Sequence, residues 1–287
     1  MFNIYNYNLR NKILYVYTEN LNFFYRINKE LNRLNIKSKI LNIGAKLPEH
    51  SSIILTTSED LQQFNNSNKN INFLMYSKDD NFNHYILKVI AAYRIEYKNN
   101  YSELTFSIDP GTKYIGMVVF LDDYYLKSQT FYDEKAFIMV IRDCVDCFQK
   151  NNPKLLRLNF KFGRGILQIT INLIKEIYHV FKNRSHLNLY LIDESKSSKI
   201  KIKDIKKRIM TKHEVSALIL AFRNGIEINY ANNFENIRKN NFQKLNTMDN
   251  KERSVEEVND LVINLKNIIG KVLNNEISLS KSIEMLK

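Results

Sequence analysis

Short apolar runs and helical apolar spacing alternate along the first hundred residues. Leu21 to Leu34 and Tyr85 to Tyr93 carry apolar side chains at the spacing of an amphipathic helix. Runs rich in β-branched and aromatic residues predict strands at Lys12–Tyr17, Ser38–Ile43, Ser52–Thr57 and Ile71–Tyr76. Alternating strands and helices favour a parallel sheet with covered faces. We therefore expect a small α/β domain over residues 1–98, whose role the pattern does not indicate.

From residue 101 the order of predicted elements changes. Glu103–Phe120 is expected to form a strand, a tight turn and a second strand. After it come a helix across the two cysteines, a strand at Leu155–Phe160, a helix at Ile166–Phe181, a strand at Leu187–Ile192 and a helix at Lys212–Asn224. Gly225 stands where the C-terminal cap of the last helix belongs. This order predicts an α/β domain over residues 101–230, with room for one more strand than the pattern shows.

The remainder of the chain is a polar linker and then two amphipathic helices, which form a helical C-terminal extension over residues 250–287. Such helices serve either as a packing element or as a docking segment for a partner. The composition, 44% hydrophobic and 25% charged, is that of a folded globular protein. No apolar run approaches the roughly 18 residues of a membrane helix, and the start lacks a signal-peptide pattern. We therefore expect a cytoplasmic protein without membrane contact.

Two cysteines, Cys144 and Cys147, lie in an apolar run with helical spacing. A structural metal site of this kind needs further thiols or imidazoles nearby, and the sequence has no second cysteine pair. Buried core thiols are therefore favoured over a redox or metal-binding role.

The net charge is +13 with a pI near 9.4, which suits a polyanionic partner. The chain is also rich in Asn, Lys and Ile, a bias that supplies lysines without a functional cause. The position of the charge is therefore more informative. Seven of the thirteen net charges come from one basic run that contains a single acid, Asp204: Lys196, Lys199, Lys201, Lys203, Lys206, Lys207, Arg208 and Lys212. This run predicts contacts with phosphates, and its alternative is a solvated loop.

Three acids stand at the ends of predicted elements. Asp109 ends the first strand in FSIDPGTKYIG, Glu194 follows an apolar strand, and Glu214 lies in the first turn of a helix. Taken singly, each has an ordinary alternative: a hairpin turn, the start of a solvated loop, and a favourable charge at a helix N-terminus. Taken together, they suit phosphodiester hydrolysis by two divalent cations, which needs carboxylates from separate elements. We predict an Mg²⁺ or Mn²⁺ site formed by these three residues.

Several polar residues beside these acids are candidates for further roles. His213 would order the nucleophilic water or protonate the leaving oxygen, although a helix N-terminus weakens its acid role. Asp193 is a second candidate ligand at the end of its strand. Lys113, in the turn after Asp109, and Arg164, between two glycines, are placed to approach the phosphates of a bound nucleic acid.

The ordered motifs FSIDPGTKYIG, RLNFKFGRG, LIDESKSS and KHEVSALIL resemble the superfamily of RuvC-type Holliday-junction resolvases and YqgF-like pre-16S rRNA nucleases. The resemblance covers Thr105 to Asn224. It implies an RNase H-like mixed sheet flanked by helices and a Mg²⁺-dependent endonuclease. It also implies that Asp109 and Glu194 are metal ligands and that Glu214 matches the acid of the closing helix.

The sequence departs from that pattern in two places. Glu214 stands where an Asp is usual, and an alignment on the two polar positions of the helix selects His213 and Ser216 instead. The strand LRLNFKF also lacks the second carboxylate of resolvases. These departures favour precursor rRNA processing or a divergent enzyme. The added domain and tail favour branched DNA, because they would supply the interface of a homodimer that cuts both strands of a junction.

Two other functions compete with an endonuclease. A sugar or acetate kinase-like ATPase also carries an Asp-x-Gly-Thr loop, but it needs a second such loop and a Gly-rich adenosine motif, which the sequence lacks. The other is a nucleic-acid-binding scaffold that keeps the fold without the chemistry. Our expectation is the endonuclease, acting on structured nucleic acid and preferentially on branched DNA.

Overall fold

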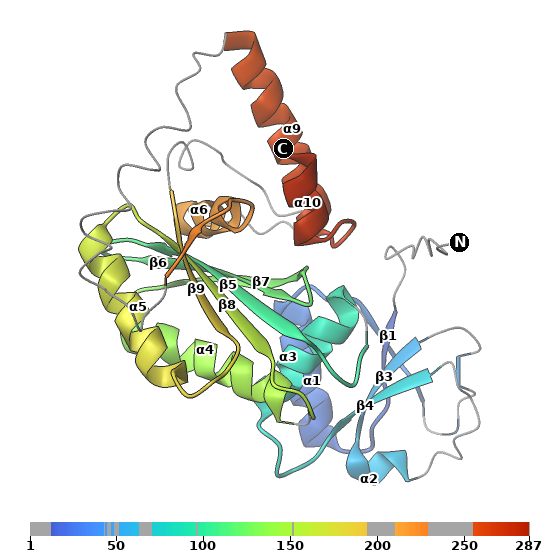
Figure 1. Ribbon diagram of the computed structural model, residues 1–287. Coiled ribbons are helices and arrows are strands. Elements are labelled where there is room, and N and C mark those ends of the chain that lie inside the picture. Colours follow the sequence, from blue (N-terminus) through green and yellow to red (C-terminus); the bar gives the residue numbers. More distant parts are fainter. Residues whose placement is uncertain are drawn as a thin grey trace, which may run out of the picture. The chain divides into compact units, whose positions relative to one another are not determined.

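The computed structural model describes residues 13–42, 44, 47–48, 52–62, 71–95, 97–150, 152–193, 210–228 and 255–286, with side chains in the last range from residue 264 onward. The chain divides into two compact units, residues 1–99 and 100–287 (Figure 1). No helix among these residues is long and apolar enough to cross a membrane.

Unit 1 contains a sheet of four parallel strands in the order β2-β1-β3-β4. Its elements are β1 (Leu14–Val16), α1 (Leu21–Arg33), β2 (Ser38–Ile40), β3 (Ser52–Thr57), α2 (Ser58–Leu61), β4 (Ile71–Tyr76) and α3 (Phe82–Arg94). Helix α1 forms because Phe23, Ile27 and Leu31 recur every four residues and are buried, while its N-cap residue Asn20 accepts a hydrogen bond from the Phe23 amide. The α/β class with parallel pairing, predicted from the alternating pattern, is confirmed.

Unit 2 contains a mixed sheet of six described strands in the order β10-β9-β8-β5-β6-β7. Its strands are β5 (Glu103–Pro110), β6 (Ile115–Leu121), β7 (Tyr124–Phe131), β8 (Arg157–Gly163), β9 (Leu187–Ile192) and β10 (Ile226–Glu227). β5, β6 and β7 form an antiparallel meander, whereas β8 and β9 run parallel to β5. This mixed sheet is consistent with the RNase H-like fold class predicted from the sequence, and the strand that the pattern missed is β7.

Side-chain alternation along the strands gives the sheet two different faces. Helices α4 (Glu134–Gln149) and α5 (Leu167–Phe181) lie on one face, and α6 (Lys212–Ala221) lies on the other (Figure 1). On the face of α5, Phe106 and Phe160 stack with ring centroids 4.9 Å apart, and Phe160 also contacts Phe181 of α5. On the face of α6, the Ser107 hydroxyl donates to the Ala217 carbonyl at 2.6 Å. The sheet therefore holds α6 directly above the central strand β5.

The C-terminal end of α6 is fixed by a lysine from the sheet. Lys161 of β8 donates through Nζ to the carbonyls of Ala221 at 2.6 Å and Arg223 at 3.1 Å. Burial lowers the pKa of Lys161 to about 8. Gly225 is not the C-cap that the sequence suggested, since Phe222 has that position. A Cβ on Gly225 would lie 2.2 Å from the Ile192 side chain, so this glycine allows close packing against β9 instead.

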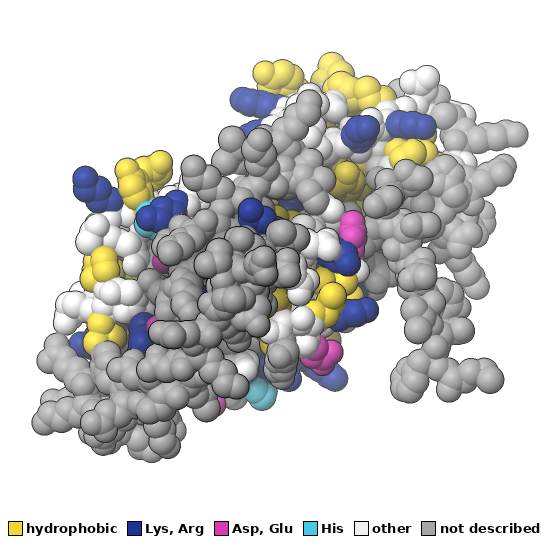
Figure 2. Space-filling model, turned by 90° about the horizontal axis from the view of Figure 1, so that it is seen from above, with side chains coloured by type: hydrophobic (Ala, Val, Ile, Leu, Met, Phe, Trp, Pro, Cys, Tyr) yellow, Lys and Arg dark blue, Asp and Glu magenta, His cyan; other side chains and the backbone are white. Residues whose placement is uncertain are grey.

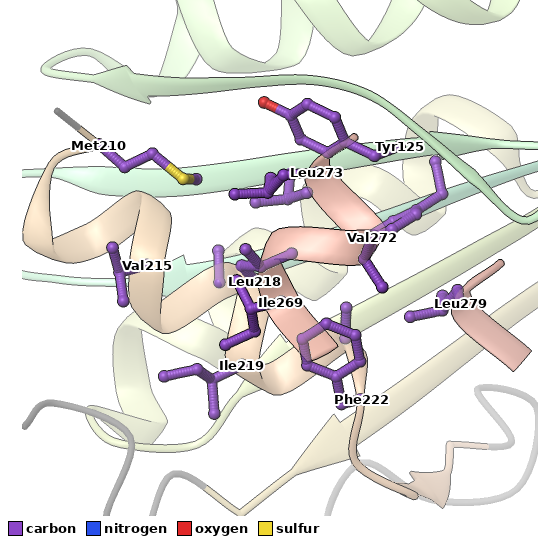
Figure 3. Close-up of a cluster of buried hydrophobic side chains, with 14 residues drawn as sticks. Tyr125, Met210, Val215, Leu218, Ile219, Phe222, Ile269, Val272, Leu273 and Leu279 are labelled. Carbon is purple, nitrogen blue, oxygen red and sulfur yellow. The ribbon is translucent and has the colours of Figure 1, made fainter. Parts of the chain in front are cut away.

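The C-terminal helices α9 (Val255–Leu273) and α10 (Leu279–Met285) complete the core above β6 and β7 (Figure 3). Their buried residues join one apolar cluster with strand and α6 residues, which includes Val118, Phe120, Val215, Leu218, Phe222, Ile269, Val272, Leu273 and Leu279. The Asn275 side chain donates to the Tyr125 carbonyl at 3.0 Å, and the Leu279 amide donates to the Asp123 carbonyl at 2.8 Å. Of the two roles considered for these helices, the described side chains serve packing within unit 2.

Both cysteines lie in α4 and are buried free thiols, as predicted. Burial raises the pKa of Cys144 to about 11. A thiol with so high a pKa is protonated at neutral pH, which makes it a poor nucleophile and metal ligand.

Candidate active site

Asp109 and His213, 104 positions apart in the sequence, meet at one end of the unit 2 sheet. Asp109 is the penultimate residue of β5 and is paired with Gly116 of β6. His213 lies in the first turn of α6, whose N-cap Thr211 accepts a hydrogen bond from the Glu214 amide at 3.2 Å. The Nδ1 atom of the imidazole lies 2.8 Å from Oδ2 of the carboxylate. The structure thus joins two of the predicted catalytic residues in one hydrogen-bonded pair.

Asp109 is buried, with a side chain that is 11% exposed. Burial raises its pKa, while the hydrogen bond with His213 and the electrostatic effect of the nearby His213 and Lys212 side chains oppose that rise without cancelling it. Among the described residues, Oδ1 of this carboxylate accepts no hydrogen bond. A poorly solvated carboxylate with one open oxygen is a suitable ligand for a hard divalent cation.

Two glycines of the β5–β6 hairpin allow α6 to approach so closely. A Cβ on Gly116 would lie 2.2 Å from the carbonyl oxygen of His213. A Cβ on Gly111 would lie 3.0 Å from Cε1 of the imidazole and 2.7 Å from the Tyr114 carbonyl oxygen. From the sequence alone, these glycines would be explained by the turn. In the structure they also leave room for α6, because a side chain at either position would collide with His213.

The structure directs the Glu214 side chain to a different place from that of His213. Its carboxylate is fully buried and accepts hydrogen bonds from the Ser128 hydroxyl at 2.7 Å and the Thr130 hydroxyl at 3.1 Å. Both hydroxyls belong to β7, which is separated from β5 by β6. Tyr125 extends the network by donating to the Ser128 oxygen at 3.2 Å. The predicted role of Glu214 as a metal ligand stays a prediction, and its observed contacts anchor the first turn of α6 to β7.

Replacement of this anchor should lower stability. In Glu214→Gln an amide NH₂ would replace one of the two acceptor oxygens, so either the buried Ser128 hydroxyl or the half-buried Thr130 hydroxyl would lose its carboxylate acceptor. We expect the free energy of unfolding to fall by about 1–3 kcal/mol, the usual cost of an unsatisfied buried polar group. Urea unfolding measures this change, with Glu284→Gln on the exposed surface of α10 as the matched control. Equal stability of the two variants would contradict the anchoring role.

Arg164 and Asp193 form an ion pair at the same edge of the sheet. Nε and Nη2 of Arg164 each lie 3.1 Å from Oδ1 of Asp193, and Arg223 donates to the Asp193 carbonyl. The strand register aligns Ile108 of β5, Phe162 of β8 and Leu191 of β9, so Asp109, near the end of β5, and Asp193, directly after β9, lie at the same end of these parallel strands. Arg164 thus neutralises an acid there, and its predicted contact with nucleic acid remains a prediction.

Much of the predicted site falls outside the described residues. Glu194 lies there, as do most members of the basic run: Lys196, Lys199, Lys201, Lys203, Lys206, Lys207 and Arg208. Among the residues that the structure describes, no three His, Cys, Asp or Glu side chains form a group that would hold a metal ion. The oxygen of Asp109 suits Mg²⁺ by its chemistry, and Glu194 remains the second ligand predicted from sequence.

Two basic residues beside the Asp109–His213 pair are exposed. Lys113 lies in the turn between β5 and β6, and Lys212 begins α6 directly before His213. On the face seen in Figure 2, basic side chains are more widespread than acidic ones among the described residues. The exposed Lys113 and Lys212 therefore favour the approach of an anion to the pair.

The sequence reasoning missed two tyrosines next to the pair. The Tyr114 ring lies 5.5 Å from the imidazole of His213, measured between centroids. The Tyr132 ring lies 5.0 Å from Tyr114 in an edge-to-face contact, and Tyr132 is 80% exposed. Tyr114 ends the turn between β5 and β6 and Tyr132 directly follows β7, so only their exposure and position distinguish them from core tyrosines.

Comparison with known proteins yields distant similarities. No protein-family model and no curated protein sequence matches the chain. The Argonaute protein Aa-Ago, solved with externally bound siRNA, aligns at 11% identity and a TM-score of 0.22 over 70% of this chain and 38% of that chain. An exopolyphosphatase from Cytophaga hutchinsonii aligns at 11% identity and a TM-score of 0.17 over 57% of this chain and 55% of that chain. The chain spans less than two thirds of the length of either protein.

Proposed function

We propose that the protein is a divalent-metal-dependent nuclease that hydrolyses phosphodiester bonds in structured nucleic acid. One observation carries this proposal. The Asp109 carboxylate, at the end of the central strand of an RNase H-like sheet, is paired at 2.8 Å with His213 at the start of α6. The exposed Lys113 and Lys212 add positive charge beside this pair. A buried carboxylate, an imidazole and flanking ammonium groups are the elements that phosphoryl transfer requires.

Asp109 would hold the cation through its open oxygen, with Glu194 as the second ligand and Asp193 as a further acid at the same edge. A divalent cation bound there lowers the pKa of a water molecule and neutralises charge on the phosphate. Because burial raises the pKa of Asp109, its carboxylate is poorly stabilised by solvent and gains from a nearby positive charge.

His213 would move the proton in this reaction. Its Nδ1 atom faces the carboxylate, which selects the tautomer with the proton on Nδ1 and leaves Nε2 as the basic atom. Nε2 would accept a proton from the attacking water, and the leaving oxygen, on the opposite side of the phosphorus, would take its proton from solvent. Glu214, bonded to β7, would act as a positioning residue that fixes the turn carrying His213.

A panel of substrates tests the proposal. Labelled four-way junctions, linear duplexes and structured RNAs are incubated with the full chain in Mg²⁺, Mn²⁺ or EDTA. We expect cleavage of at least one structured substrate that depends on the metal, with branched DNA preferred and precursor rRNA as the alternative. Branched DNA further requires a homodimer, which light scattering measures. Binding without cleavage across the whole panel would favour a scaffold and overturn the nuclease.

The ATPase alternative gains no support from the fold of unit 1. Its described strands are all parallel, so they do not repeat the antiparallel meander that carries Asp109. Tight ATP binding in the absence of any nucleic-acid cleavage would nevertheless favour that alternative over the nuclease.

A further inference from the structure

Tyr114 and Tyr132 form an exposed aromatic pair beside the Asp109–His213 pair, and folding does not account for it. Tyr132, the residue after β7, is 80% exposed, and Tyr114 is 38% exposed. Their edge-to-face contact leaves most of the Tyr132 ring open to solvent. An exposed ring buries little apolar surface, so it contributes little to the stability of the core.

The position of the pair connects it to the reacting groups. Tyr114 contacts the imidazole of His213, and Tyr132 extends outward from Tyr114, so the rings form a row that leads away from the site. Lys113 precedes Tyr114 in the exposed turn, and Lys212 precedes His213. Aromatic rings next to ammonium groups match a nucleic-acid strand, because bases stack on the rings while phosphates meet the charges.

We propose that Tyr132, supported by Tyr114, is a stacking platform for an unpaired nucleobase adjacent to the scissile phosphate. This inference rests on the proposed nuclease function and narrows its substrate to strands with at least one unstacked nucleotide at the cut. A paired base in a continuous duplex is stacked on its neighbours and does not offer a free face. Junction points in DNA and loops or bulges in RNA both supply such a base.

A single tryptophan reports on the platform directly, because the chain contains none. Tyr132→Trp places the indole on the platform. The matched control is Leu155→Trp. Leu155 is 53% exposed and lies just before β8, at the end of the parallel strands opposite to Asp109. Each full-length variant is titrated with single-stranded DNA, single-stranded RNA and a blunt duplex in EDTA. Fluorescence anisotropy of the labelled strand measures binding independently.

We expect single strands to quench the indole at position 132 and not at 155, and the blunt duplex to quench neither. Tyr132→Ala should weaken single-strand binding by about tenfold, while Tyr132→Phe should keep it, since stacking needs the ring and not the hydroxyl. Binding of strands without quenching at 132 would overturn the platform and leave the nuclease intact. Failure to bind any nucleic acid at low salt would overturn both. The DNA and RNA arms show which strand the platform accepts.

Discussion

Asp109→Asn should abolish metal-dependent cleavage while leaving the protein at least as stable as the wild type. Loss of the carboxylate removes the open oxygen that we assign to the cation. The expected fall in cleavage rate is at least about 10³-fold, because the cation contributes several kcal/mol to the transition state. The asparagine carbonyl can still accept the hydrogen bond from Nδ1 of His213, so the local geometry should survive.

The stability part of this expectation follows from the pKa of Asp109. Its folded-state pKa lies above the ordinary value of 3.8, so the folded protein binds this proton more tightly than the unfolded chain. The stability that Asp109 contributes is therefore lost as the pH rises from 3.8 through the higher pKa of the folded state. At neutral pH the ionised carboxylate lowers the free energy of unfolding. A neutral asparagine removes that cost.

Cleavage assays and thermal unfolding at pH 7 measure the two effects together. Asp79→Asn, which changes an exposed acid of unit 1, is the matched control and should change neither. Retained cleavage in Asp109→Asn would contradict the proposed role. A large loss of stability would show instead that Asp109 is a structural residue.

Gly116→Ala should disrupt both stability and activity, although glycine to alanine is a small change. The new methyl group would lie 2.2 Å from the His213 carbonyl oxygen and 2.3 Å from its carbonyl carbon, so backbone must move. Overpacking of this kind costs about 3 kcal/mol. A shift of α6 by about 1 Å would also move His213 from Asp109 and reduce cleavage by roughly 10²-fold.

Gly270→Ala is the matched control for this substitution. Gly270 lies within α9, and a Cβ there would meet no atom within 4 Å. Alanine should raise helix stability at that position by up to about 1 kcal/mol, with cleavage unchanged. Urea unfolding and the cleavage rate of both variants give the comparison. If Gly116→Ala had the same stability and cleavage rate as Gly270→Ala, the result would contradict the close contact between the hairpin and α6.

The sheet could be predicted because local patterns encode most of it. Strand β5 is buried along almost its whole length, and β8 alternates the buried Leu158, Phe160 and Phe162 with polar residues, so both carry a strand pattern in the sequence. Strand β7 was missed because it is an edge strand of the described sheet, where Lys127, Ser128 and Gln129 interrupt the apolar sequence. Its polar residues make sense only with its neighbours, since Ser128 and Thr130 bind the carboxylate of Glu214.

By itself the sequence determined that Asp109 ends a strand and that His213 and Glu214 begin a helix, because strand ends and helix starts have local signals. Which of the two helix residues faces Asp109 was decided by the tertiary structure. Neighbouring residues of a helix point about 100° apart, so the choice depends on how α6 is rotated above the sheet. The contacts at Gly116, Ser107 and Lys161 set that rotation, and all three come from strands distant in the sequence.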